Sequence, residues 1–222
     1  MLVLHYTGME SSAAALARLC DPAAEVSAHY LVEEDGAVLQ LVPEHRRAWH
    51  AGRSYWRGAT DINSRSIGIE IVNPGHEWGY RAFPAVQIAA LIPLCRGILA
   101  RHGIPARNVV GHSDIAPDRK EDPGELFPWE QLANKGIGLW PEPVSSVAVL
   151  PPPGAIRQAL AAFGYQVDEV GAESRVTRNT IRAFQRRFRP GRLDGVFGRE
   201  CCAFLAGLLR KADCEPPPGF LF

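Results

Sequence analysis

Two histidines and one aspartate lie at strand ends or in a loop, where their side chains could bind one metal ion together. His5 ends the apolar run near the start of the chain, and His112 follows the short strand Val109-Val110. Asp122 lies ten residues after His112 in a proline-bounded loop. Two imidazoles and one carboxylate form a ligand set of catalytic zinc sites that leave a fourth position for water. The three residues are far apart in sequence, so their spacing alone leaves open that they are unrelated polar side chains.

An α/β fold with a mixed sheet flanked by helices is predicted to position these residues. The expected elements are strand 2–6, helix 13–19, strands 29–33 and 38–42, strand 66–72, helix 85–102 and strand 109–110. Asp35-Gly36 suits the tight turn of a hairpin between the second and third strands. In strand 66–72 three isoleucines share one face, so Glu70 points to the opposite face. Because strands and helices do not alternate strictly, a mixed sheet is favoured over a regular parallel one.

The composition divides the chain into two modules joined by a linker. The 222 residues include 24 basic and 24 acidic side chains in an ordinary globular mixture. Residues 151–222 carry about four excess positive charges, and residues 1–150 about four excess negative ones. After a proline-rich stretch come three short amphipathic helices, one expected to begin near Pro153 and one to be capped by Thr177. We therefore predict a first domain at 1–140, a Pro-rich linker at 141–153 and a small three-helix domain at 154–222.

The sequence shows no segment of the kind that spans a membrane. No apolar run approaches the roughly 20 residues of a membrane span, and the first residues lack the features of a secretory signal. As written, the chain is expected in the cytoplasm, whereas a leader missing from this sequence would place it in the periplasm or cell envelope. Its five cysteines are an odd number without metal-like pairing, so they are predicted to be reduced thiols. The oligomeric state is not predicted.

An arginine-rich stretch in the second module raises nucleic-acid binding as one alternative. Its members are Arg178, Arg182, Arg186, Arg187, Arg189 and Arg192. Such runs are usually solvated helix faces, and the overall pI of about 7.1 argues against a strong phosphate footprint. We therefore expect no nucleic-acid partner.

Several short segments of the chain form an ordered series of motifs. They are His5-Tyr6-Thr7, Ser27-Ala28-His29-Tyr30, Trp49-His50-Ala51-Gly52, and the segments 63–70, 111–117 and 120–124. Together they resemble the zinc-dependent N-acetylmuramoyl-L-alanine amidases of the type 2 amidase family over nearly all of residues 1–140. Phe127-Pro128-Trp129 and the appended helices resemble the broad-specificity branch, which cleaves both intact wall stems and anhydro-muropeptides. Residues 154–210 resemble the three-helix peptidoglycan-binding domain of wall hydrolases.

The resemblance implies a role for each chemical residue and an activity for the whole chain. His5, His112 and Asp122 are expected to hold one Zn²⁺. Glu70 is expected to take a proton from water and pass it to the leaving amine, and Lys120 to stabilise the charge that develops on the amide oxygen. The implied reaction is hydrolysis of the amide between N-acetylmuramic acid, or its 1,6-anhydro form, and L-alanine, in cell-wall turnover or recycling.

Further residues are predicted to contact the peptidoglycan or muropeptide substrate. They are Tyr6, His50, Ala51, Gly52 and Asn63. His29 is instead predicted to be a buried, hydrogen-bonded histidine. The main alternative is a non-catalytic peptidoglycan-binding protein, for which a lost zinc ligand would be expected, and all three are present. The second module is expected to retain substrate without chemistry, so truncation near Val149 would spare activity on soluble muropeptides.

Overall fold

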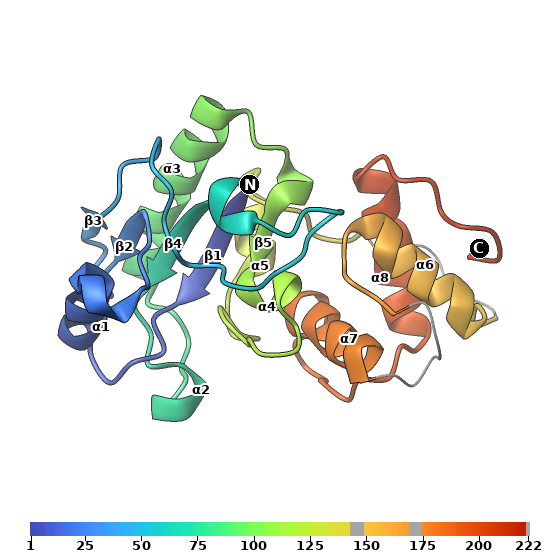
Figure 1. The fold of residues 1–222 in the computed structure, drawn as a ribbon. Helices are drawn as coiled ribbons and strands as arrows, with labels where there is room; N and C mark the ends of the chain where they lie inside the picture. The colour runs from blue at the N-terminus through green and yellow to red at the C-terminus, as the bar shows by residue number, and fades with distance from the viewer. Residues whose placement is uncertain (143–148, 169–174, 221–222) are drawn as a thin grey trace.

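A mixed five-stranded sheet forms the centre of the N-terminal module, and three helices form the C-terminal module (Figure 1). The computed structural model describes residues 1–142, 149–168 and 175–220. Residues 143–148 of the predicted linker lie outside the described residues.

The strands have the order β3-β2-β4-β1-β5 across the sheet. Their bounds are β1 Leu2–Tyr6, β2 Tyr30–Val32, β3 Val38–Gln40, β4 Ile67–Ile71 and β5 Val109–Gly111. All neighbouring pairs are parallel except β2 and β3, which form the predicted antiparallel hairpin. Gly36 has a φ of 91° in its turn, as the Asp-Gly dipeptide indicates. The predicted mixed sheet is therefore confirmed.

Helices cover the sheet and build the second module. Their bounds are α1 Ser12–Cys20, α2 Gly75–Trp78, α3 Ala85–His102, α4 His112–Ile115, α5 Trp129–Ala133, α6 Pro153–Phe163, α7 Arg175–Phe188 and α8 Arg199–Lys211. The Ser11 side chain caps α1, and α3 has the predicted bounds and ends at Gly103, which adopts a left-handed conformation. The prediction that Thr177 caps a helix is wrong, because α7 begins earlier and Thr177 is buried inside it. In the described part of the chain, no helix is both long and apolar enough to cross a membrane.

The two faces of the sheet belong to different hydrophobic clusters. Alternation along β1 sends Leu2 and Leu4 to one face, where they pack with the isoleucines of β4 and the apolar side of α3. Val3 lies on the other face, in a cluster that also holds the apolar side chains of α6, α7 and α8. This cluster therefore joins the C-terminal module to the sheet.

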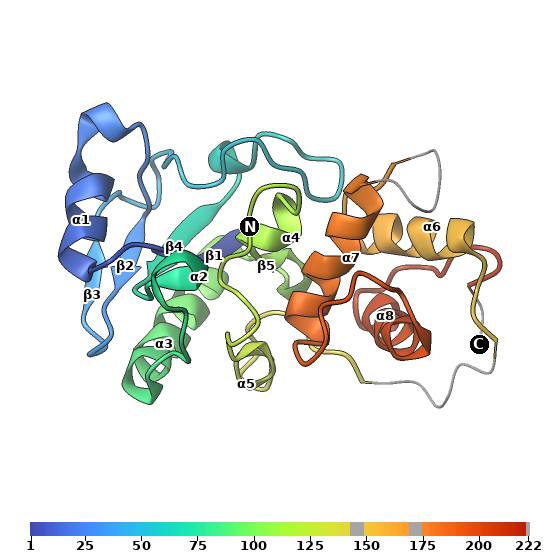
Figure 2. The same cartoon turned by 90° about the horizontal axis from the view of Figure 1, so that it is seen from below.

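The contact between the modules runs through the loop before β4 and through the short helix α4. Trp56 packs edge-on against Phe163 and Tyr165, with ring centroids 5.9 and 5.1 Å apart. Seen from below, α7 lies between α4 and α8 (Figure 2). The second module thus shares a core with the first, which the sequence did not predict.

Candidate active site and metal centre

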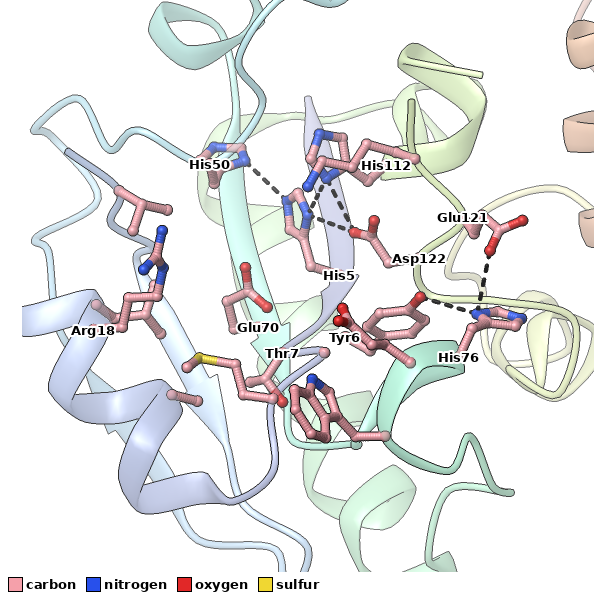
Figure 3. Close-up of a pocket in the computed structure, with 18 of the residues that line it drawn as sticks. His5, Tyr6, Thr7, Arg18, His50, Glu70, His76, His112, Glu121 and Asp122 are labelled. Atoms are coloured by element: carbon pink, nitrogen blue, oxygen red, sulfur yellow. Dashed lines mark hydrogen bonds and ion pairs between the residues drawn. The ribbon is translucent and has the colours of Figure 1, made fainter. Parts of the chain in front are cut away.

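The predicted ligands His5, His112 and Asp122 converge in one buried group (Figure 3). His5 Nδ1 lies 3.0 Å from His112 Nδ1 and 3.0 Å from Asp122 Oδ2, and His112 Nδ1 lies 3.0 Å from the same carboxylate oxygen. Three donor atoms that face a common point, two imidazole nitrogens and one carboxylate oxygen, match the preference of a zinc-like cation. The residues present therefore fit a metal centre.

Strand register explains why residues so distant in sequence meet here. In the parallel pair of β1 and β5, Leu4 lies opposite Gly111, so His5 and His112 each come one residue later at the same edge of the sheet. Glu70 lies directly opposite His5 in the parallel pair of β1 and β4. Carboxyl ends of parallel strands meet at one edge, which is where open α/β sheets build their sites.

Hydrogen bonds fix the tautomer of His5. The Ser66 hydroxyl donates to the Ile62 carbonyl at 2.7 Å, so its oxygen accepts from His50 Nε2 at 3.2 Å. His50 Nδ1 is then an acceptor and takes the proton of His5 Nε2 at 3.0 Å. This series of hydrogen bonds leaves the lone pair of His5 Nδ1 facing His112 Nδ1 and Asp122 Oδ2.

His112 is held in the same tautomer by the backbone. Its Nε2 lies 3.2 Å from the Ala51 carbonyl oxygen, which can only accept a hydrogen bond. The Nδ1 lone pair of His112 is therefore also directed at the common point. Both imidazoles thus present the nitrogen that a cation needs, with the opposite nitrogen satisfied by the protein.

The charge states of the group suit a cation as well. Burial and the nearby His112 lower the pKa of His5 to about 4, although the neighbouring Asp122 acts to raise it. Burial alone would raise the pKa of Asp122, but the two histidines outweigh it and hold that pKa well below the usual range. At neutral pH His5 is neutral and Asp122 is ionised, which are the forms that bind metal.

Glu70 points from β4 into the same cavity, beside His5 (Figure 3). Its Oε2 is buried and has no hydrogen-bond partner among the described residues. Burial, followed by the charge of Asp122, raises the pKa of Glu70 well above its ordinary value, while Lys120 opposes this rise. Lys120 also lines the cavity. A carboxyl group with a raised pKa beside a metal centre is able to accept and return a proton.

The predicted substrate residues divide into two groups. Tyr6 and His50 line the cavity, which has a volume of about 670 Å³. Ala51, Gly52 and Asn63 are not among its lining residues, and Asn63 Oδ1 instead accepts from the backbone N–H groups of His50 and Ala51, at 3.0 and 2.8 Å. The contact of these three residues with substrate stays a prediction. The hydrogen bonds of Asn63 hold the loop that carries His50.

His76 lines the cavity but was not found from the sequence. Its Nδ1 lies 2.9 Å from the Tyr6 hydroxyl and its Nε2 lies 3.1 Å from Glu125 Oε2. That hydrogen bond with Glu125 raises the pKa of His76. The residue comes from α2, a helix of four residues, which is too short to show a periodic pattern. By contrast, His29 is a buried histidine with both ring nitrogens hydrogen-bonded, as predicted.

The chain matches known proteins in both modules. Residues 1–125 match the family model of N-acetylmuramoyl-L-alanine amidase, and residues 151–205 match that of a peptidoglycan binding domain. The N-acetylmuramoyl-L-alanine amidase AmiD of Escherichia coli is 42% identical over 95% of this chain and 82% of its own length. The 1,6-anhydro-N-acetylmuramyl-L-alanine amidase AmpD of the same organism is 42% identical over 48% of this chain and 56% of its own length.

Solved structures agree with the sequence matches. The complex of E. coli AmiD with the substrate anhydro-N-acetylmuramic acid-L-Ala-D-gamma-Glu-L-Lys superposes with a TM-score of 0.85 at 41% identity, covering 97% of this chain and 90% of that one. AmpDh3 of Pseudomonas aeruginosa in complex with anhydromuramic pentapeptide gives 0.86 at 35% identity, covering 96% and 91%. The family model spans more than half of the chain and the first relative nearly all of it, so the chain belongs to the N-acetylmuramoyl-L-alanine amidase family, with a peptidoglycan-binding domain at its C-terminal end.

Proposed function

We propose that this protein hydrolyses the amide bond between N-acetylmuramic acid, or its 1,6-anhydro form, and the L-alanine of the peptidoglycan stem peptide. The main support is that three buried atoms able to bind a metal ion converge in an open cavity, beside Glu70, whose buried Oε2 has no hydrogen-bond partner among the described residues. The family match and the muropeptides bound to two relatives support this reaction and a place in cell-wall recycling.

The metal in this proposal is one Zn²⁺ held by His5, His112 and Asp122. Histidine nitrogen and carboxylate oxygen are ligands that zinc takes in hydrolases of this kind. Zinc supplies a Lewis acid that polarises a carbonyl group and makes water acidic enough to react near neutral pH. The tautomers fixed by His50 and Ala51 prepare the two imidazoles for this role.

The remaining chemistry belongs to two side chains of the cavity. Glu70 takes a proton from the attacking water, because its unpaired Oε2 and raised pKa make it a base that is also able to give the proton back. It then delivers that proton to the leaving amine of L-alanine. The cation of Lys120 faces the charge that develops on the amide oxygen.

The test combines metal analysis with product analysis. Purified protein is incubated with anhydro-muropeptide or with sacculi, and mass spectrometry follows release of peptides that begin with L-alanine. The His112→Ala variant should lose both zinc and product formation. His102→Ala, which removes a histidine in the last turn of α3 that does not line the cavity, should keep both. Stoichiometric zinc and full activity in the His112→Ala protein would refute the assignment, and retention on sacculi without any cleavage would favour the non-catalytic alternative.

A further inference from the structure

A buried carboxylate connects the C-terminal module to the segment that carries His112. Asp114 Oδ2 accepts from the Gly111 backbone N–H at 2.9 Å and from Arg187 Nη1 at 2.7 Å. Asp114 Oδ1 accepts from the Tyr165 hydroxyl at 2.6 Å. Gly111 and Asp114 lie on either side of His112, so two side chains of the second module hold the turn that presents this ligand.

Arg187 is anchored to the same segment by further contacts. Its Nη2 donates to the Val109 carbonyl of β5 at 3.0 Å, and its guanidinium carbon lies 4.1 Å from the centroid of the Trp129 ring. The Arg187 side chain is 3% exposed and that of Asp114 is 1% exposed. A charge buried this deeply is stable only with its partner, so the pair fixes α7 against β5 and α4.

The neighbouring arginine reaches the segment that carries the third ligand. Arg186 Nη2 lies 2.9 Å from Glu121 Oε1, and Arg186 Nε lies 3.5 Å from Glu125 Oε2. Glu121 directly precedes Asp122 in the chain. Two adjacent arginines of α7 therefore contact the segment that carries His112 and the segment that carries Asp122.

We propose that α7 of the C-terminal module is part of the support of the metal centre, with Arg187 and Arg186 as positioning residues for His112 and Asp122. The proposal rests on the proposed function in that these two residues are taken as zinc ligands. It gives the module a task in addition to holding the cell wall. Outer groups that orient metal ligands typically change metal affinity by about 10- to 100-fold when they are removed.

The experiment uses the full chain and compares two arginine variants of the same region. Arg187→Met removes the donor to Asp114 while keeping an apolar stem. Arg189→Met is the matched control, because the Arg189 side chain is also largely buried, at 10% exposed against 3% for Arg187, but pairs with Asp194 inside the second module. Zinc affinity is measured by competition with a chromogenic chelator, and the visible spectrum of the Co²⁺-loaded protein reports the ligand geometry.

We expect Arg187→Met to weaken zinc binding by about 10- to 100-fold and to change the cobalt spectrum. Arg189→Met should leave affinity and spectrum as in the parent, even if it lowers the melting temperature. Equal zinc affinity and an identical spectrum in the parent and Arg187→Met would overturn the proposal. So would an equal loss in both variants, because that would report general destabilisation.

A milder variant decides the matter if Arg187→Met does not fold. Tyr165→Phe removes one hydroxyl that donates to Asp114 and keeps the ring that packs on Trp56. It should weaken zinc binding and shift the cobalt spectrum in the same direction by a smaller amount, and parental behaviour would overturn the proposal. Failure of the parent protein itself to bind zinc would instead refute the proposed function.

Discussion

Replacing Gly68 by alanine should disturb the proposed zinc site through the ring of His50. A Cβ atom at Gly68 would lie 2.4 Å from His50 Cγ and 2.6 Å from its Cδ2 and Nδ1. Carbon atoms in contact prefer about 3.5 to 4.0 Å, so the ring would have to move by roughly 1 Å or more. The ring cannot move freely, because it is held between His5 and Ser66 by hydrogen bonds of 3.0 and 3.2 Å.

The magnitude follows from these contacts. Overpacking of a buried site costs about 1 to 3 kcal/mol, and each lost hydrogen bond about 0.5 to 1.5 kcal/mol, so the free energy of unfolding should fall by about 2 to 6 kcal/mol. Loss of the His5–His50 bond also frees the tautomer of His5, which should weaken zinc binding by about 10- to 100-fold. Denaturant unfolding of the metal-free protein measures the first effect, and chelator competition measures the second.

Two further variants make the steric argument testable. Gly191→Ala is the control, because no atom lies within 4 Å of the added Cβ and the backbone is not left-handed there. It should leave both quantities unchanged. In the double variant Gly68→Ala with His50→Ala, space for the methyl group returns, so the stability loss should be less than additive while zinc binding stays weak. Parental stability and zinc affinity in Gly68→Ala would refute the reasoning.

Three other outcomes are expected. Glu70→Gln should keep zinc and fold but lose about 10²- to 10⁴-fold in turnover, because the amide cannot take a proton; normal turnover would remove Glu70 from the mechanism. The metal-free protein should lose stability as the pH falls from 6.5 to about 4, because His5 binds a proton in this range in the unfolded chain but not in the folded one. This difference should lower the free energy of unfolding by about 3 kcal/mol across the range. In the His5→Gln variant the free energy of unfolding should depend less on pH. Deleting residues from Val149 onward should lower the melting temperature and the activity on both soluble and insoluble substrates, because Val110 and Ile115 lose the helices they pack against. A folded fragment with full activity on soluble muropeptide would instead support the expectation of independent modules.

Local patterns predicted the elements that carry their own signals. The α3 helix has apolar periodicity, Pro84 before it and Gly103 after it, and its bounds agree with the prediction. Alternation in β4 placed Glu70 on the face opposite the isoleucines. In the structure Glu70 lines the cavity, and the isoleucines pack in the hydrophobic cluster that holds Leu2 and Leu4. These signals are short-range, so one sequence is enough to read them.

What escaped prediction depends on contacts between distant segments. His76 reaches the cavity from a four-residue helix, and Trp56 enters the shared core from a loop, so neither has a period that marks it. The apolar faces of α6 and α7 were correctly expected to be buried. The spacing of their apolar residues does not tell whether these helices pack only on each other or also on the first module.

The opposite charges of the two modules take on a different meaning in the structure. They suggested two separate modules, of which the basic one was expected to retain substrate. Both Arg186 and Arg187 are instead largely buried, and they pair with Glu121 and Asp114 of the first module, respectively. Part of the positive excess is thus complementary to the first module and is withdrawn from solvent. Charge asymmetry between two segments of one chain therefore fits an interface between them as well as it fits separate partners, and the buried arginines decide in favour of the interface.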